Sequence, residues 1–157
     1  MNTARNTALN TVRNTGEAFH WSARVYYENT DAGGVVYHAE YLKFMERART
    51  EWLRDLGFEQ QALLQERGLL FAVANMEIDF LASARLDDLL NVSVILEQTK
   101  RVSLTLAQTI TRSNPADDAA PLIRAKVRIA MLSRDFKPVR IPADILNRLQ
   151  PPLDEQP

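Results

Sequence analysis

One long amphipathic segment stands out along the chain. Between His38 and Leu56, apolar residues recur at steps of three and four, and charged residues fill the opposite side. The apolar positions are Tyr41, Phe44, Met45, Ala48, Trp52 and Leu56, and the charged positions are Glu40, Lys43, Arg47, Glu51 and Arg54. This spacing predicts a helix over residues 38–56 that ends at Gly57. At 1.5 Å per residue it is about 28 Å long, and we expect it to form the centre of the fold.

Strand-like patterns flank this helix on both sides. The stretch His20–Tyr27 precedes it and is rich in aromatic and β-branched residues. Four stretches with a period of two follow it, at 75–80, 91–96, 102–107 and 123–131, and short helices are predicted at 60–67 and 142–149. We expect the four later strands to form an antiparallel meander whose apolar face packs on the long helix. The predicted fold class is therefore α+β, an antiparallel sheet wrapped around one long central helix.

The two ends of the chain differ in composition from its middle. Residues 1–18 contain a near-repeat of Asn, Thr and Arg, with too few apolar residues to bury a core. Residues 151–157 form a proline-rich end. We therefore expect a disordered tail over 1–18, one folded domain over 19–150 and a flexible C-terminus over 151–157.

The overall composition excludes several classes of protein. The chain of 157 residues has a net charge of −1, no cysteine and two histidines, His20 and His38. A balanced charge argues against a protein that coats nucleic acid or an anionic membrane. The lack of cysteine removes disulfide, thiolate and Fe–S chemistry, and two histidines cannot form a multi-histidine metal site in one chain. No apolar run approaches the ~20 residues of a membrane span. We expect a cytoplasmic protein without a metal or a cofactor.

The residues able to carry chemistry are concentrated between Tyr27 and His38, where the first strand leads into the long helix. The first turn of a helix presents unpaired N–H groups and a positive dipole end, which can stabilise an oxyanion. Gly33 and Gly34 allow a substrate carbonyl to approach the backbone closely. A carboxylate such as that of Asp31 can act there as a nucleophile or as a general base on water. Together these groups can cleave an activated acyl group.

Ordinary structural roles explain the same residues. Asp-x-Gly-Gly is a common turn sequence, and an aspartate ahead of a helix is often a cap. A histidine in the first turn of a helix commonly makes a structural hydrogen bond, and a tyrosine on a strand commonly packs. From the residues alone, the segment indicates an acyl-transfer site without excluding a plain turn.

The run from Val25 to Leu42, VYYENTDAGGVVYHAEYL, resembles the opening motif of the YbgC-type acyl-CoA thioesterases. These enzymes are the Tol–Pal-associated branch of the 4-hydroxybenzoyl-CoA thioesterase family, which has the hotdog fold. The similarity continues through FMERARTE at 44–51 and ARLDD at 84–88, and it covers about residues 21–149. The hotdog fold has the same order of one strand, one long helix and four strands that periodicity predicts. One residue departs from the motif, because Asn29 stands where this branch usually has an aspartate.

Carried over residue by residue, the resemblance implies that Asp31 is the catalytic carboxylate. The glycine-containing turn of the family falls on Gly33 and Gly34. The helix-start amide that polarises the thioester carbonyl falls on the backbone N–H of His38. This branch also has a tyrosine and a histidine in the site, and these match Tyr27 and His38. The missing charge at residue 29 should not abolish the reaction if Asp31 is the working group.

A CoA thioester carries several phosphate charges, so basic residues are expected at the rim of its pocket. Lys100 and Arg101, at the turn into the strand that contains Ser103, match a basic stretch that contacts the nucleotide in the wider family. A solvated hairpin with a charged tip explains them equally well. Two other sets of charged residues have structural explanations. Arg124, Lys126 and Arg128 lie on the outer face of a strand and can pair with Glu77 and Asp79 across neighbouring strands. Glu46 and Arg49 can form an ion pair on the surface of the long helix.

The resemblance implies hydrolysis of acyl-CoA thioesters, and also of acyl carrier protein thioesters, to free acid and thiol. Hotdog enzymes join two subunits edge to edge with the active site at the boundary, so it also implies a homodimer or homotetramer. Two alternatives stay open: a hotdog enoyl-thioester hydratase, and a non-catalytic acyl-thioester-binding adaptor linked to lipid synthesis and the cell envelope. Intact Asp31 and Gly34 favour the enzyme.

Overall fold

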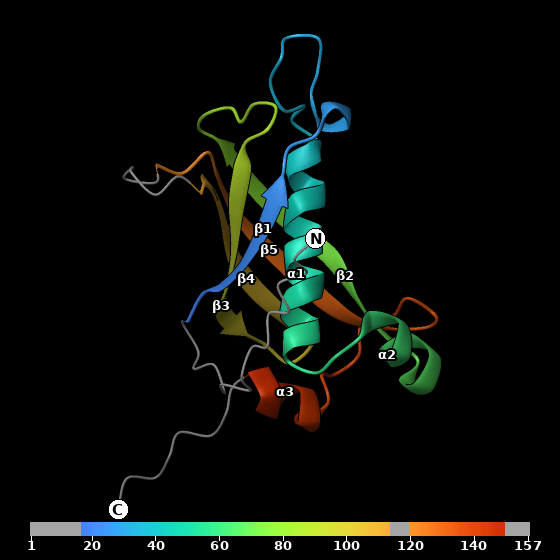
Figure 1. Cartoon of the computed structure of the whole chain (residues 1–157). Helices are drawn as coiled ribbons and strands as arrows, with labels where there is room; N and C mark the ends of the chain where they lie inside the picture. The colour runs from blue at the N-terminus through green and yellow to red at the C-terminus, as the bar shows by residue number, and fades with distance from the viewer. Residues whose placement is uncertain (1–16, 114–119, 150–157) are drawn as a thin grey trace, which may run out of the picture.

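The computed structural model describes residues 17–113 and 120–149 (Figure 1). In chain order its elements are β1 (Phe19–Arg24), the 3-10 helix η1 (Tyr27–Asn29), α1 (Glu40–Asp55), α2 (Gln60–Arg67), β2 (Leu69–Phe80), β3 (Leu89–Thr99), β4 (Ser103–Arg112), β5 (Ile123–Ser133) and α3 (Ala143–Leu149). The predicted C-terminal segment, and all of the predicted tail except residues 17 and 18, lie outside the described residues.

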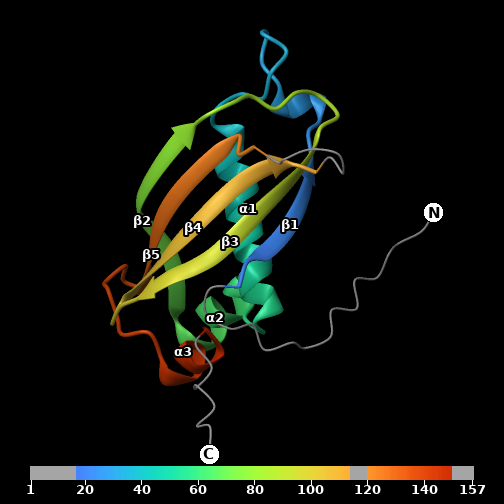
Figure 2. The same ribbon diagram turned by 90° about the vertical axis from the view of Figure 1, so that its left-hand side faces the viewer.

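Five strands form one antiparallel sheet in the order β1-β3-β4-β5-β2, so β1 and β2 are its edges. The sheet curves around α1, which lies across one of its faces (Figure 2). The predicted α+β hotdog architecture is therefore confirmed. The expected four-strand meander is right for β3, β4 and β5 and wrong for β2, which pairs with β5. The reason is that β1 already occupies the free side of β3, and residues 81–88 cross the end of the sheet to connect β2 with β3.

The helix α1 packs its apolar face against the sheet. Phe44, Met45 and Ala48 are at most 1% exposed. Burying a large apolar side chain contributes about 1.5–3 kcal/mol to folding. The helix ends where predicted, because Gly57 adopts a left-handed φ of 95° and its N–H donates to the Arg54 carbonyl.

Two charged residues of α1 are buried, contrary to the sequence prediction. Glu40 is 9% exposed and Arg49 is 7% exposed. Glu40 was expected on the solvent side of the helix and Arg49 in a surface ion pair with Glu46. Both side chains instead point toward other elements that supply hydrogen bonds, Asn29 for Glu40 and Gln108 for Arg49.

The ends of two strands also differ from the prediction. β1 stops at Arg24, so Tyr27 lies in η1 and not on a strand. The chain leaves the sheet because Val25 exchanges backbone hydrogen bonds with Asp87 and Asp88. β2 begins at Leu69, well before residue 75. Its first residues are continuously apolar, so alternation does not reveal them, and a bulge between Val73 and Asn75 interrupts the register.

The outer face of the sheet carries the expected charges. Glu77 lies opposite Lys126, and Asp79 lies opposite Arg124, on β2 and β5. Lys126 also forms an ion pair with Glu97 of β3 at 3.5 Å. In the described part of the chain, none of the helices is both long and apolar enough to cross a membrane.

Candidate active site

The predicted site lies at the end of the molecule where α1 begins, at the top of Figure 1. Residues 30–36 form a small hairpin there, with a backbone bridge between Thr30 and Val36. The Asp31 N–H donates to the Val35 carbonyl at 2.9 Å, and the Gly34 N–H donates to the Asp31 carbonyl at 3.0 Å. Gly34 has a φ of 78°, a conformation that L side chains rarely adopt. The glycine at this position therefore allows the tight turn that presents Asp31.

The carboxylate of Asp31 is exposed and held in a fixed orientation. Its Oδ1 accepts a hydrogen bond from the Gly33 N–H at 2.8 Å. A Cβ at residue 33 would lie 3.1 Å from that same oxygen, so a side chain there would crowd the carboxylate. The contact is the local side-chain-to-backbone turn expected of Asp-x-Gly. It engages one oxygen, and the other has no hydrogen-bond partner among the residues that the structure describes.

The entrance of α1 provides unpaired amides. The N–H groups of His38 and Ala39 have no acceptor within the described ranges, whereas the Glu40 N–H donates to the Tyr37 carbonyl. α1 begins at Glu40, two residues after the predicted start, because residues 38 and 39 form a turn that leads into it. Unpaired N–H groups at the positive end of a helix are suited to binding an oxyanion.

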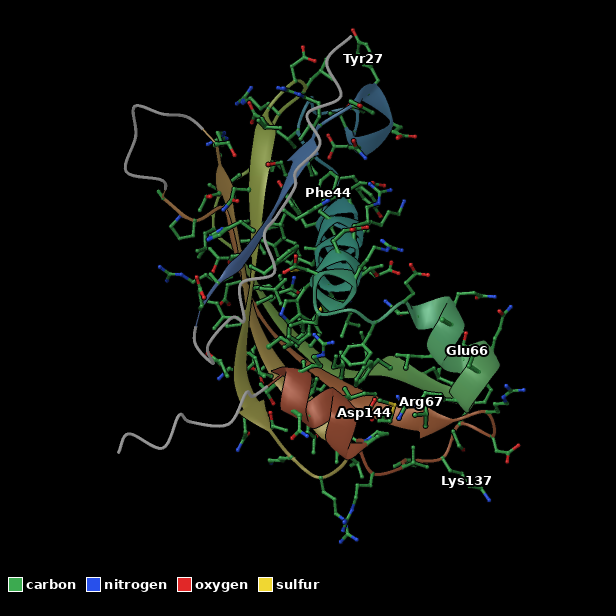
Figure 3. The ribbon with its side chains drawn as sticks, turned by 60° about the horizontal axis from the view of Figure 1, so that its bottom comes forward. Tyr27, Phe44, Glu66, Arg67, Lys137 and Asp144 are labelled. Atoms are coloured by element: carbon green, nitrogen blue, oxygen red, sulfur yellow. The ribbon has the colours of Figure 1, made fainter. Side chains whose placement is uncertain are left out.

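Aromatic side chains surround the His38 imidazole. His38 is exposed, and its ring lies edge-on to Tyr37, with centroids 4.5 Å apart, and to Phe80, at 6.2 Å. Tyr27 is 82% exposed and projects from η1 at the same end of the molecule (Figure 3). Several apolar side chains at this end are exposed in the single chain: Tyr26, Tyr27, Tyr37, Phe80 and Leu81.

The predicted nucleotide-contacting residues lie elsewhere. Lys100 and Arg101 are exposed in the turn between β3 and β4, and Ser103 is 5% exposed at the start of β4. This turn is at the end of the sheet opposite to the Asp31 hairpin, at the lower left of Figure 2. One chain therefore brings Asp31, Gly33, Gly34, His38 and Tyr27 to one end and leaves Lys100, Arg101 and Ser103 at the other.

A cavity of about 490 Å³ lies beside α1. It is lined by one flank of α1 together with residues of β2, β5 and α2: Leu42, Lys43, Glu46, Arg49, Thr50, Leu53, Gln60, Phe71, Val73, Met76 and Ile129. The cavity thus follows the edge strand β2. Most of its lining is apolar, and its three charged residues, Lys43, Glu46 and Arg49, are all on α1.

Arg49 and Gln108 form a buried polar link that helix periodicity does not predict. Arg49 Nη1 donates to Gln108 Oε1 at 2.8 Å, and Gln108 Nε2 donates to the Met45 carbonyl at 3.1 Å. Burial lowers the pKa of the Arg49 guanidinium from its usual value. The spacing held a signal, because Arg49 follows Met45 by four residues and so shares its face of the helix.

Asn29 and Glu40 form a second buried link, at the base of the hairpin. Asn29 is 4% exposed, and its Nδ2 donates to Glu40 Oε2 at 2.9 Å. Lys43 Nζ donates to Glu40 Oε1 at 2.8 Å. These two hydrogen bonds hold the pKa of the Glu40 carboxyl below its usual value. The bond from Lys43 has the larger effect, and the bond from Asn29 has the next largest. A carboxylate is therefore present beside residue 29, although residue 29 is itself an amide.

Comparison with known proteins assigns the family. Residues 33–119 match the model of the thioesterase superfamily. The chain is 44% identical over 128 residues to the acyl-CoA thioesterase YbgC of Haemophilus influenzae, covering 81% of this chain and 90% of that protein. It is 32% identical over 124 residues to the acyl-CoA thioesterase YbgC of Helicobacter pylori, covering 76% and 90%. The chain belongs to the thioesterase superfamily.

Solved structures agree with this assignment. A probable thioesterase from Bartonella henselae has a TM-score of 0.75 and 37% identity, covering 80% of this chain and all of that one (100%). The 4-hydroxybenzoyl-CoA thioesterase from a Pseudomonas species has a TM-score of 0.78 at 19% identity, covering 83% of this chain and 98% of that one. At that identity the second likeness concerns the fold alone.

Proposed function

We propose that the protein is an acyl-CoA thioesterase that hydrolyses acyl-CoA to a free acid and a thiol. The observation that carries this proposal is the hairpin of residues 30–36. It presents the oriented Asp31 carboxylate at the end of the molecule where α1 begins, and the first amides of that helix entrance are unpaired. The thioesterase relatives at 44% and 32% identity support the same activity.

The chemistry follows from these groups. The thioester carbonyl oxygen accepts hydrogen bonds from the His38 and Ala39 N–H groups, which stabilise the negative charge of the tetrahedral intermediate. Asp31 acts in one of two ways. As a general base it removes a proton from water, and the hydroxide adds to the carbonyl carbon; as a nucleophile it forms an anhydride that water then cleaves. In both routes the C–S bond breaks and the thiolate takes up a proton.

His38 and Tyr27 complete the proposed site. Both are exposed at the same end as Asp31, and each can donate or accept a hydrogen bond. We propose that these two side chains orient the attacking water or the leaving thiolate. Gly33 and Gly34 keep the turn free of side chains, so that the acyl group can approach the backbone.

The proposed enzyme works as a homodimer, or as a homotetramer made of two such dimers. β2 is a long edge strand of 12 residues, with exposed Val73 and Phe80 and the 490 Å³ cavity along its inner side. A second copy joined at this edge would cover these apolar surfaces. Because Lys100 and Arg101 lie far from Asp31 in their own chain, we propose that they serve the CoA phosphates of the partner's site.

Replacement of Asp31 by Asn tests the catalytic assignment. Asn keeps the oxygen that accepts the Gly33 N–H, so the hairpin should persist while the base or nucleophile is lost. We expect kcat for thiol release to fall at least about 100-fold with little change in KM. Asp135→Asn, an exposed aspartate in the turn after β5, is the matched control and should leave kcat unchanged. A folded Asp31→Asn protein with the kcat of the unmodified enzyme would contradict the assignment.

The same assay separates the alternative functions. Release of free thiol from acyl-CoA identifies a thioesterase, whereas hydration of crotonyl-CoA without thiol release identifies a hydratase. Tight binding of acyl-CoA without turnover identifies the adaptor, in which Asp31 would only form its turn with Gly33. Acyl carrier protein thioesters share the pantetheine arm of CoA, so we include them among the proposed substrates and in the same panel.

The phosphate assignment is tested with two substrates that share one acyl group. For Lys100→Ala/Arg101→Ala we expect KM for acyl-CoA to rise about tenfold or more, because charge-assisted hydrogen bonds are lost. KM for the N-acetylcysteamine thioester, which has no nucleotide, should stay the same. Lys126→Ala/Arg128→Ala removes two exposed cations of β5 and serves as the control. Equal effects on both substrates would contradict a role in phosphate binding.

The cellular setting belongs to the proposal as well. We place the protein in the cytoplasm, where CoA thioesters are made and used, and associate it with the Tol–Pal system of the envelope on the basis of the resemblance. Cell fractionation and co-purification with envelope components test these two assignments.

A further inference from the structure

The base of the Asp31 hairpin is built around a buried pair of polar side chains. Asn29 is 4% exposed and Glu40 is 9% exposed, and their side chains meet at 2.9 Å between Nδ2 and Oε2. The remaining oxygens are also used. Asn29 Oδ1 accepts from the Tyr26 N–H at 2.8 Å, and Glu40 Oε1 accepts from Lys43 Nζ at 2.8 Å. A chain of three hydrogen bonds thus joins η1 to the first turn of α1.

This pair closes the segment that carries the site. Residues 30–39 lie between its two members and include both Asp31 and His38. One backbone bond runs beside the pair, from the Tyr37 N–H to the Asn29 carbonyl at 2.9 Å. Beyond it, the Thr30–Val36 bridge continues the hairpin outward to its exposed tip. The Asn29–Glu40 contact thus closes the base of the segment that contains both Asp31 and the helix-entry amides.

We propose that Asn29 and Glu40 are positioning residues, which fix the Asp31 carboxylate relative to the helix-entry amides of His38 and Ala39. This inference rests on the proposed function of Asp31. Both side chains are buried and their polar atoms are occupied by hydrogen bonds within the protein, so neither is assigned contact with the substrate. Misplacement of a reacting group by about 1 Å can cost about 100-fold in rate, so a bond at the base of the hairpin can control kcat.

The direction of the hydrogen bond makes the proposal specific. Asn29 supplies the donor and Glu40 the acceptor. With Asn29→Asp, two carboxylate oxygens would meet at a buried contact, and one of them would have to bind a proton. With Asn29→Asp/Glu40→Gln, the amide moves to residue 40 and donates in the opposite direction. The heavy atoms are the same in number and shape, and the bonds from Tyr26 and Lys43 keep their acceptors.

Steady-state kinetics of thiol release on Asn29→Asp, on Glu40→Gln and on the double variant test this proposal. For Asn29→Asp we expect kcat about 100-fold lower at pH 8, with KM for acyl-CoA unchanged. Its kcat should recover as pH falls, because a proton taken up between residues 29 and 40 restores one hydrogen bond. The charged groups that act on this contact, Lys43 and Arg47, are both on α1.

The double variant provides the decisive comparison. We expect Asn29→Asp/Glu40→Gln to return kcat to within about threefold of the unmodified enzyme and to lose the added pH dependence, because the bond is rebuilt. Glu40→Gln alone should change kcat by less than about threefold, since Gln Oε1 can still accept from Asn29 while the exposed Lys43 side chain, which loses its acceptor, turns to solvent. Asn147→Asp adds the same charge at an exposed position of α3 and should change neither kcat nor its pH profile.

Thermal unfolding and Asp31→Asn, measured in parallel, separate the possible failures. A purely structural pair would lower the Tm of Asn29→Asp and leave the kcat of its folded fraction unchanged, which would overturn the inference. Failure of a well-folded double variant to recover kcat would also overturn it. If Asp31→Asn itself retains kcat, the proposed catalytic role of Asp31 is wrong, although the protein is still a thioesterase. If Asp31→Asn is inactive while Asn29→Asp is fully active at all pH values, only the inference is wrong.

Discussion

A single hydroxyl connects the central helix to the segment that crosses the end of the sheet. Tyr41 Oη accepts a hydrogen bond from the Ala84 N–H at 2.9 Å. Tyr41 is 3% exposed and Ala84 is fully buried at 0%. Burial raises the pKa of the Tyr41 hydroxyl above its usual value. Because the Ala84 carbonyl accepts from the Val36 N–H, this contact also supports the Asp31 hairpin from below.

Removal of this hydroxyl should cost stability. In Tyr41→Phe the Ala84 N–H stays buried and loses its acceptor, so we expect the free energy of unfolding to fall by about 1–3 kcal/mol. Urea denaturation followed by circular dichroism measures the difference. Tyr37→Phe changes a tyrosine that is 46% exposed and should have almost no effect. Equal midpoints for the two variants would contradict the importance of the Ala84 contact.

At the residue scale, local sequence identified the groups of the hairpin but not those beneath it. Asp31 and its glycines were found because a turn of this kind needs particular residue types at adjacent positions. Glu40 was assigned to solvent from its place on the helix. Its burial depends on Asn29, which lies 11 residues earlier and reaches it only after the chain has folded back. Periodicity contains no information on such a partner.

At the element scale, the two short helices are joined to each other at the end opposite to the hairpin. Arg67 of α2 donates two hydrogen bonds to the Asp144 carboxylate of α3, at 2.7 and 2.9 Å (Figure 3). Arg134, in the turn after β5, donates to the carbonyls of Leu64 and Gln65 at the end of α2. The hydrogen bonds from Arg67 hold the pKa of the Asp144 carboxyl below its usual value.

The Arg67–Asp144 pair predicts a pH-dependent contribution to stability. Since the pKa of Asp144 is lower in the folded chain than in the unfolded chain, the pair stabilises the fold above the unfolded-state value of about 3.9. That contribution is lost as pH falls through the lower, folded-state value. We therefore expect Arg67→Met to lower Tm at neutral pH and the difference from the unmodified protein to vanish in acid. Calorimetry from neutral pH to about pH 2 measures it. A constant difference at all pH values would assign the effect to packing and contradict the prediction.

Elements with a strong local signal were predicted well, and their pairing was not. α1 begins two residues after its predicted start, and α2 has its predicted bounds, Gln60–Arg67. Each strand after α2 was found, but β2 was expected beside β3. Strand order depends on which hydrogen-bonding edges remain free after the long helix has packed, and this is a property of the assembled sheet.

At the scale of the whole molecule, the edge strand β2 decides how copies are expected to assemble. For Val73→Lys we expect dissociation of the proposed dimer and a large loss of thiol release, because a charge would stand on the edge and in the cavity beside it. Ser22→Lys places the same charge on the other edge strand, β1, and should leave both properties intact. Sedimentation velocity measures the assembly. A fully active monomer would contradict a site shared between two copies.

Local sequence patterns predict the central helix, the approximate strands and the residues of the Asp31 turn, because these depend on side-chain periodicity and on backbone preferences of neighbouring residues. The position of β2 at the sheet edge, the burial of Glu40 and Arg49, and the separation of Lys100 from Asp31 are visible only in the folded chain. Each of these depends on contacts between residues distant in the chain. Such contacts form when the sheet curves around α1, and no local pattern records them.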